Sequence, residues 1–181
     1  MMLAWLRNFH RSQRGVISVE AIMILPILIW AFFGSFTIFE AFRQRSISLK
    51  ATYTIADMLS RQIDAVGPDA IDGLNDVFEY LTFARDPSWI RVTSVYWDKN
   101  QNRFRQKWSR ATHDHDGLTD TTLQDMVDYV PAMASGDTVL LVESYMPFRP
   151  VFDMGLASGV TRHVIVTRPR FASQVIYDPS S

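Results

Sequence analysis

An uninterrupted apolar run near the start of the chain limits what this sequence can fold into more than any other feature. The 19 residues from Ala21 to Phe39 contain no charged side chain. A helix rises about 1.5 Å per residue, so a helix over residues 16–39 would be roughly 36 Å long, enough to cross a hydrocarbon core of about 30 Å. We therefore predict a transmembrane helix over residues 16–39.

The charge distribution around this run suggests an orientation. Residues 1–15 contain Arg7, Arg11 and Arg14 and no acid. Of the 18 basic residues in the chain, 15 therefore remain in the rest, against 19 acidic residues, a balance of −4. Basic residues also follow the run, at Arg43, Arg45 and Lys50, so the preference of arginine and lysine for the cytoplasmic side gives only a weak signal. We expect a basic cytoplasmic leader at 1–15 and an exported body, because the leader is short and wholly basic and the acidic residues come later. The apolar run is longer than the core of a cleaved secretory signal, so an uncleaved anchor is the ordinary alternative.

The composition excludes several classes of function. The net charge is −1 and the region after the apolar run has no dense basic patch, so we expect no nucleic-acid partner. The chain has no cysteine, which excludes disulfides, thiolate catalysis and cysteine-ligated zinc. It also lacks a G-x-S-x-G elbow, a phosphate loop and a dinucleotide fingerprint. We therefore expect a protein that is not an enzyme and needs no cofactor.

Glu20 is the unusual residue of the membrane segment. A charge at the bilayer centre costs on the order of 2.5–3.5 kcal/mol, but Glu20 would lie only about 6 Å along the helix from Val16. It is either a tolerated residue at the membrane edge or a carboxylate that needs a cationic partner. A peptidase cut after Gly15 would create such a cation, because Val16 would then carry a free amine. A neighbouring subunit's amine could pair with Glu20 and set the register between helices.

The stretch RGVISVEAIMILPIL resembles the N-terminal motif of the TadE-like family, the minor pseudopilins of the tight-adherence (Flp pilus) system. Gly15, Val19, Glu20 and Pro26 stand at the places of the family pattern, whereas Ala21 stands where many members have phenylalanine. The resemblance implies cleavage between Gly15 and Val16 by a prepilin peptidase and an assembly role for Glu20. The stretches KATYTIADMLSRQ and VTRPRF are similar to later parts of alphaproteobacterial relatives, but less specifically.

Four other residues of the run bear on helix packing. Pro26 removes a backbone donor, so we expect a kink that a membrane helix tolerates. The small residues Ala31, Gly34 and Ser35 would allow another helix to approach closely. Such small-residue patches are also common by chance.

The helix is expected to continue beyond the membrane. No proline or glycine occurs between Ser35 and Val66, and Gly67-Pro68 is the first strong stop. We therefore predict one helix to about Ala65, with an amphipathic stem at 40–66. Its apolar face is predicted at Phe42, Leu49, Tyr53, Ala56, Leu59 and Ile63.

The remaining residues, 67–181, predict an α+β head. Helical periodicity, alternation and turn residues indicate two helices, at 69–81 and 121–130, and four strands, at 89–98, 103–109, 137–148 and 161–171. The fold class is therefore α+β, with a long N-terminal helix and a small antiparallel sheet, in a pilin-like layout. One hairpin is rich in aromatic residues that we assign to the sheet core first and to a contact surface second: Trp89, Tyr96, Trp97, Phe104 and Trp108.

The stretch THDHDGLTD offers the strongest candidate metal ligands, His113, Asp114, His115 and Asp116. Read as a calcium loop, it has Leu123 where a bidentate glutamate is needed. Read as a zinc site, it lacks a third ligand. We therefore interpret the stretch as a hydrophilic loop and expect no metal.

Together with the resemblance to the TadE-like family, these features predict a single-pass bacterial inner-membrane pseudopilin with a cytoplasmic N-terminus and a periplasmic head. Its expected partners are the lipid bilayer, a prepilin peptidase, and other pilins and assembly proteins of the Tad system, and it could enter the pilus itself. One alternative is an uncleaved envelope protein whose head is a binding module. A remote alternative is a membrane-tethered metal-dependent enzyme, and another is a larger sister protein of the same system, against which the short chain argues.

Overall fold

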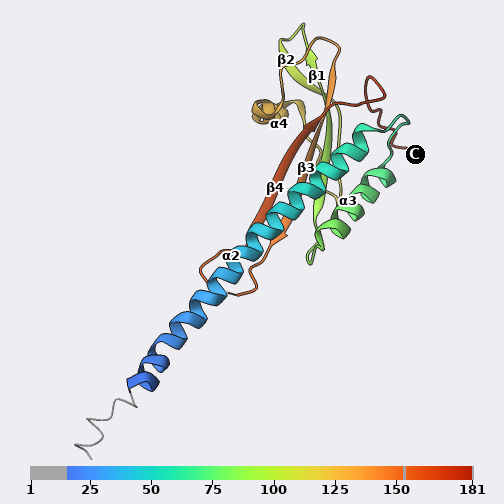
Figure 1. Cartoon of the computed structure of the whole chain (residues 1–181). Coiled ribbons are helices and arrows are strands. Elements are labelled where there is room, and N and C mark those ends of the chain that lie inside the picture. The colour runs from blue at the N-terminus through green and yellow to red at the C-terminus, as the bar shows by residue number, and fades with distance from the viewer. Residues whose placement is uncertain (1–15, 153, 181) are drawn as a thin grey trace, which may run out of the picture. The chain divides into compact units, whose positions relative to one another are not determined.

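A single long helix begins the part of the chain that the structure describes. This computed structural model describes residues 16–152 and 154–180, with side chains from residue 19 onward. Helix α2 runs from Val16 to Ser60 and continues through Pro26 (Figure 1). The described residues divide into two compact units. One holds α2 as far as Ala41 together with Pro150–Ala157, and the other holds Phe42–Arg149 with residues 158–180.

The second unit is built on an antiparallel sheet of four strands in the order β2-β1-β3-β4. The strands are β1 (Trp89–Asp98), β2 (Arg103–Ala111), β3 (Thr138–Phe148) and β4 (Gly159–Thr167). Strands β1 and β2 form one hairpin, and β3 and β4 form another. At the centre of the sheet β1 pairs with β3, for example Val92 with Val142. A bulge in the β1–β2 pairing lies between Ser94 and Val95. The predicted α+β class, with a long N-terminal helix and a small antiparallel sheet, is confirmed.

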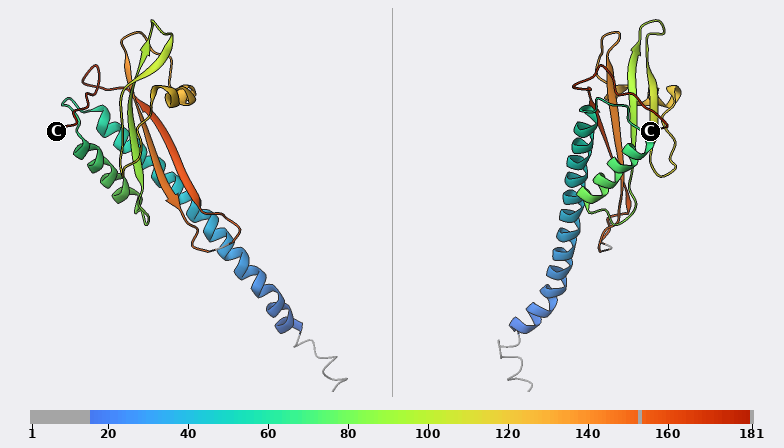
Figure 2. Two further views of the ribbon diagram at one scale, coloured as in Figure 1. Left: turned by 180° about the vertical axis from the view of Figure 1, so that it is seen from behind. Right: turned by 90° about the vertical axis from the view of Figure 1, so that its right-hand side faces the viewer.

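Helices cover both faces of this sheet. The C-terminal part of α2 and helix α3 (Pro68–Thr82) lie on one face, and α4 (Asp120–Leu123) with the 3₁₀ helix η2 (Gln124–Tyr129) lies on the other (Figures 1 and 2). Each face therefore has its own buried cluster, since alternate strand residues point to opposite faces. The first includes Ile55, Phe78 and Val142, and the second includes Leu123 and Leu141.

Several predicted elements differ from the structure in their bounds or type, most of them by one or two residues, and three of the differences have a local cause. Helix α2 ends at Ser60, not near Ala65, because its last turn tightens and the carbonyl of Ser60 accepts a hydrogen bond from the amide of Arg170 at 2.8 Å. The segment 121–130 is one α-helical turn followed by 3₁₀ helix, not a single α-helix. Strand β4 ends at Thr167, before Pro169, which has no amide to donate to a ladder.

The predicted apolar face of the stem is wrong in large part. Ala56 and Leu59 are buried, but Phe42 and Tyr53 are 66% and 56% exposed. Leu49 and Ile63 are exposed as well. The face that packs on the sheet is rotated about the helix axis relative to the predicted one. It consists of small and polar residues together with two aliphatic ones, namely Ser48, Ala51, Thr52, Ile55, Ala56, Leu59 and Ser60.

Candidate functional site

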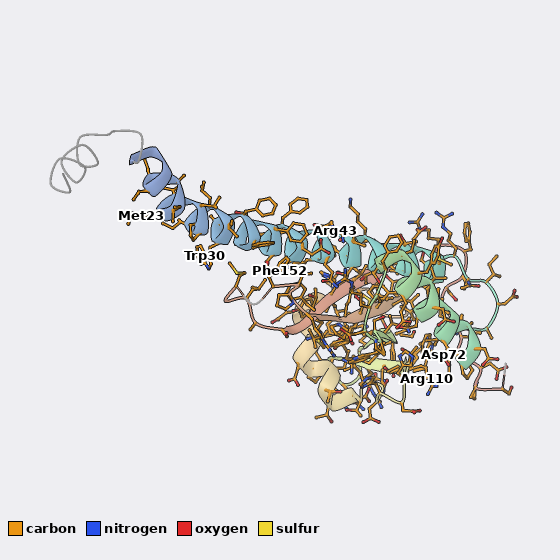
Figure 3. The ribbon with its side chains drawn as sticks, turned by 90° about the horizontal axis from the view of Figure 1, so that it is seen from below. Met23, Trp30, Arg43, Asp72, Arg110 and Phe152 are labelled. Atoms are coloured by element: carbon orange, nitrogen blue, oxygen red, sulfur yellow. The ribbon has the colours of Figure 1, made fainter. Side chains whose placement is uncertain are left out.

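The first half of α2 exposes its apolar side chains. Among the described residues, the structure has one helix that is long and apolar enough to cross a membrane, starting at Val19, and its most apolar window is only 6% buried. Met23 and Trp30 are 69% and 64% exposed, and Figure 3 shows both on this stretch. A core helix of a soluble protein would bury such residues. The exposure is therefore consistent with lipid contact and a single-pass membrane protein.

Glu20 lies on this exposed stretch, in the second turn of α2. The predicted cleavage site is only partly described: Gly15 and the leader lie outside the described residues, whereas the backbone of Val16 begins the helix. Glu20 is four positions after Val16, a rise of about 6 Å. The carboxylate is thus accessible to a group on a neighbouring molecule, and its place near the helix start is the one that the sequence predicts.

The small residues of the run do not share one environment. Ala31 and Ser35 are exposed, whereas Gly34 is partly covered by the loop that follows β3. A Cβ atom at Gly34 would lie 3.9 Å from Cε of Met154, and the ring centroids of Phe33 and Phe152 are 4.6 Å apart. Within this unit, the loop therefore occupies the Gly34 side of the helix and leaves Ala31 and Ser35 open to another partner.

Hydroxyl groups join the stem to the sheet in the second unit. Oγ of Ser48 lies 2.8 Å from Nε2 of His163 on β4, and Oγ1 of Thr52 lies 2.6 Å from Oγ of Ser144 on β3. All four residues are buried. Buried hydroxyls need partners, so these two contacts fix the helix at one position on the sheet more specifically than aliphatic packing would.

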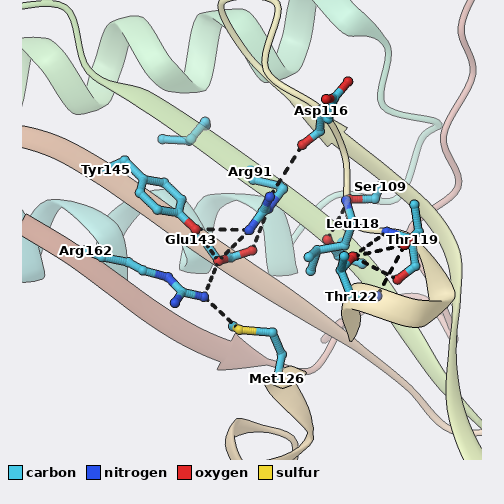
Figure 4. A network of polar contacts seen from close by, with 12 residues as sticks. Arg91, Ser109, Asp116, Leu118, Thr119, Thr122, Met126, Glu143, Tyr145 and Arg162 are labelled. Carbon is cyan, nitrogen blue, oxygen red and sulfur yellow. Dashed lines mark hydrogen bonds and ion pairs between the residues drawn. The ribbon is translucent and has the colours of Figure 1, made fainter. Parts of the chain in front are cut away.

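The opposite face of the sheet carries a buried ion network centred on Glu143 (Figure 4). Its side chain is fully buried and pairs with two arginines: Nε of Arg91 lies 2.7 Å from Oε2, and Nη2 of Arg162 lies 2.7 Å from Oε1. The hydroxyl of Tyr145 donates to Oε1 at 2.7 Å, and the rings of Trp89 and Tyr145 stack at 3.7 Å. The Arg91 guanidinium lies 5.7 Å from each ring centroid.

These contacts shift the titration of the network. Burial by itself raises the pKa of Glu143, but the hydrogen bonds and charge of Arg91, with the bonds from Tyr145 and Arg162, outweigh it and hold the pKa below its usual value. Burial and the neighbouring carboxylate raise the pKa of Tyr145 to about 12. Glu143 is thus a stable anion that is already neutralised, and the geometry favours a structural role over acid–base chemistry.

An open cavity of about 630 Å³ adjoins this network. Arg91, Tyr145 and Arg162 line it from the sheet, and Thr119 and Asp125 line it from the segment around α4. Neither Glu143 nor its partners Arg91, Tyr145 and Arg162 were predicted from the sequence. The signal was present in the stretch LLVESY, where a glutamate interrupts a buried strand and implies a cationic partner.

The His113–Asp116 stretch forms an exposed loop in which His113 and Asp114 both have positive φ angles. Nδ1 of His113 lies 2.8 Å from the carbonyl oxygen of Ser88, and the ring of His115 stacks on Trp89 at 4.0 Å. Among the described residues, the side chains of histidine, aspartate and glutamate form no group of three that could hold a metal ion. The four candidate ligands are therefore not brought together.

The aromatic residues of the β1–β2 hairpin mostly pack inside the second unit. Phe104 is buried and meets Trp97 edge to face at 4.8 Å. Trp108 stacks on Tyr177 and donates its indole N–H to the carbonyl of Val175 at 2.9 Å. These residues are thus part of the sheet core, as the alternation of the strand predicts.

Comparisons of the chain with protein-family models, with curated proteins and with solved structures found no match.

Proposed function

We propose that this chain is a TadE-like pseudopilin, a non-enzymatic inner-membrane component in the assembly of a Flp-type pilus. One observation carries the proposal most directly. Helix α2 is continuous over 45 residues, exposes an apolar stretch with Glu20 near its start, and packs on an antiparallel sheet near its end. A single helix that anchors the chain in a membrane and also packs in the core of the head suits a subunit that assembles through its helix.

The proposal gives each motif residue a role. A prepilin peptidase cuts between Gly15 and Val16, and the new amine of one subunit meets the Glu20 carboxylate of another. An ion pair is favourable there because each charge would otherwise stand alone at the edge of a medium of low dielectric. Pro26 bends the helix, and Ala31 and Ser35, which the loop after β3 leaves open, allow close contact with neighbouring helices.

The same proposal sets the location and the partners. The N-terminus lies in the cytoplasm, the α+β head lies in the periplasm, and the chain crosses the inner membrane once. Its partners are the lipid bilayer, the peptidase, and the other pilins and Tad assembly proteins. The apolar, largely exposed first half of α2 supports the membrane placement.

Cleavage is tested by expressing the full chain with and without a prepilin peptidase and measuring the mass of the membrane-extracted protein. We expect a mature chain that begins at Val16 only when the peptidase is present. Gly15→Leu should block the cut, whereas Gly34→Leu, the same substitution within the helix, should leave it unchanged. A chain that keeps its leader in the presence of an active peptidase would overturn the proposal.

The ion pair is tested by Glu20→Gln, with Glu40→Gln as the matched control on the same helix. Removing the charge of Glu20 should leave membrane insertion intact, because an amide is less costly to insert, but should reduce pilus assembly on the order of tenfold or more, the effect of about 1.4 kcal/mol. Equal assembly by both variants would show that no pairing at Glu20 is needed.

A second function is favoured by the cavity of about 630 Å³ beside Arg91, Tyr145 and Arg162. In this alternative the chain is an uncleaved single-pass envelope protein whose head binds another molecule. Two results would favour this alternative over the pseudopilin. The leader would stay intact, and a larger side chain in place of Thr119, at the cavity wall, would abolish binding of the other molecule by the head.

A further inference from the structure

We propose that the loop between β3 and β4, over Pro150–Ala157, is a second membrane contact: its apolar side chains dip into the lipid interface beside α2. This inference rests on the proposed membrane insertion of α2. The loop, more than a hundred residues after the apolar run in sequence, thereby returns to the bilayer surface. The occupant of the loop's exposed apolar surface is lipid, not another protein.

The first observation is where the loop lies within its unit. The ring of Phe152 sits against two phenylalanines of α2, with its centroid 4.6 Å from that of Phe33 and 6.2 Å from that of Phe36, and Figure 3 shows it beside the helix. Cε of Met154 is the nearest atom to a Cβ built at Gly34, at 3.9 Å. The loop thus packs on the apolar run itself.

The second observation is the depth of these contacts. The charge-free run ends at Phe39, so Phe33 and Phe36 lie about 9 Å and about 4.5 Å before its end. Apolar groups of segments that lie in the membrane interface are buried about 5–10 Å into the boundary between headgroups and acyl chains. A loop held against Phe33 and Phe36 is therefore at interfacial depth whenever the run spans a bilayer.

The third observation is the character of the loop. Two of its apolar side chains are exposed, Val151 at 47% and Leu156 at 36%. On α2 the neighbouring Phe32 and Phe39 are also exposed, at 66% and 65%. Loop and helix thus both expose apolar side chains, and because Phe152 packs on Phe33 and Phe36, lipid that surrounds the helix at this depth also reaches the loop.

The charges of the segment limit how far it enters. Asp153 is the one ionisable residue that the sequence has in 150–157, and Arg149 precedes it and pairs with Asp86. A carboxylate in the sequence of the loop makes full insertion into the hydrocarbon core costly. The loop is therefore an interfacial contact and not a second spanning segment.

The absence of cysteine from the chain allows a direct test with single introduced cysteines. The full chain would carry Val151→Cys or Leu156→Cys, labelled with an environment-sensitive fluorophore and reconstituted in phosphatidylcholine–phosphatidylglycerol vesicles. Ile24→Cys, in the apolar run, is the reference for lipid. Ile176→Cys, an exposed apolar position of the other unit, is the reference for water.

We expect lipids with a shallow doxyl group to quench the probes at 151 and 156 at least about twice as strongly as the probe at 176, as interfacial residence requires. Equal quenching at 151, 156 and 176, with strong quenching at 24, would overturn the loop contact and leave the membrane anchor intact. Weak quenching at 24 as well would instead remove the anchor on which both proposals rest.

A matched pair of charged variants tests whether the apolar side chains themselves hold the loop in lipid. With the probe at 156, Val151→Glu should reduce quenching to the level of the probe at 176, because a carboxylate resists the interface. Val160→Glu places the same charge on an exposed residue of β4 outside the loop and should leave quenching unchanged. Undiminished quenching in Val151→Glu would contradict the proposal.

Discussion

Oγ of Ser48 on α2 lies 2.8 Å from Nε2 of His163 on β4, and both residues are buried. The hydroxyl also donates to the carbonyl of Arg45 at 3.0 Å, so the serine links the histidine to the helix backbone. This contact lies between the helix and the edge strand of the sheet. Because the hydroxyl gives its proton to Arg45, Nε2 of His163 donates to Ser48, and the contact places one imidazole in the buried interface between the stem and the sheet.

We expect the attachment to weaken in mild acid. Burial, together with the charge of Arg45, lowers the pKa of His163 below its usual value of 6.5. A lowered pKa in the folded state means that the unfolded state binds the proton first. The stabilisation is therefore present above about pH 6.5 and is lost as the pH falls through the folded-state pKa.

The measurement is the free energy of unfolding of the full chain in detergent, between pH 5 and pH 8. His163→Gln should remove part of the decline that the wild-type protein shows on acidification. His115→Gln, which removes an exposed imidazole outside this contact, is the control and should keep the wild-type slope. Parallel curves for wild type and His163→Gln would show that this histidine does not couple pH to folding.

The Thr52–Ser144 contact predicts a measurable coupling energy across the same interface. Thr52→Val and Ser144→Ala should each reduce the free energy of unfolding by roughly 1–2 kcal/mol, because each leaves one buried hydroxyl with less hydrogen bonding. The double variant should cost less than the sum, by at least about 0.5 kcal/mol. Tyr53→Ser, at the next position but exposed, should change stability by less than about 0.5 kcal/mol.

That comparison separates two accounts of the stem. If the apolar face read from the sequence were the packed one, Tyr53→Ser would be costly and Thr52→Val would be harmless or stabilising. The reverse order is expected from the structure. Strict additivity of Thr52→Val and Ser144→Ala would mean that the two hydroxyls do not depend on each other.

Loss of the Glu143 carboxylate should be among the most damaging single changes in the head. Glu143→Gln leaves the Arg91 guanidinium, whose side chain is only 15% exposed, without its counter-charge. Breaking one side of a buried ion pair costs roughly 3–5 kcal/mol. Asp137→Asn is the control, because its partner Arg168 is 59% exposed and surface pairs contribute little.

The same network predicts an acid limit distinct from that of His163. The folded-state pKa of Glu143 is lowered, so its stabilisation is present above about pH 4.5 and is lost as the pH falls further. Denaturant titrations of the wild-type protein between pH 3 and pH 6 should show a free energy of unfolding that falls with pH. In Glu143→Gln this free energy should depend less on pH. An unchanged acid slope in the variant would assign the loss to other carboxylates.

The secondary structure could be predicted largely from the sequence because its signals are local. The alternation in WIRVTSVYWD and the spacing of Ile71, Leu74 and Phe78 are each contained in one element, and β1 and α3 match them closely. The membrane run is local as well. Predictions that depended on distant partners were the weaker ones.

The stem face shows why. Ser48 and Thr52 are polar, so a search for apolar periodicity passes over them, yet their hydroxyls meet residues 115 and 92 positions away in the sequence. The large side chains of Phe42 and Tyr53 suggested that they face the core, but the helix packs on the sheet through its smaller side chains instead. The contact of Phe152 with Phe33 is equally invisible before the chain is folded, because nothing local in either segment indicates the other.

Two glycines should respond oppositely to the same substitution. Gly73 lies inside α3 with nothing within 4 Å of an added Cβ, so Gly73→Ala should stabilise the protein by about 0.5–1 kcal/mol through the higher helix propensity of alanine. A Cβ at Gly117 would instead lie 2.7 Å from the carbonyl oxygen of Ser109, so Gly117→Ala should cost roughly 1–3 kcal/mol. Urea unfolding of the full chain in detergent measures both, and each variant is the other's control for the added methyl group. A stabilised Gly117→Ala variant would mean that the loop entering α4 shifts without cost and that the close approach to β2 is not needed.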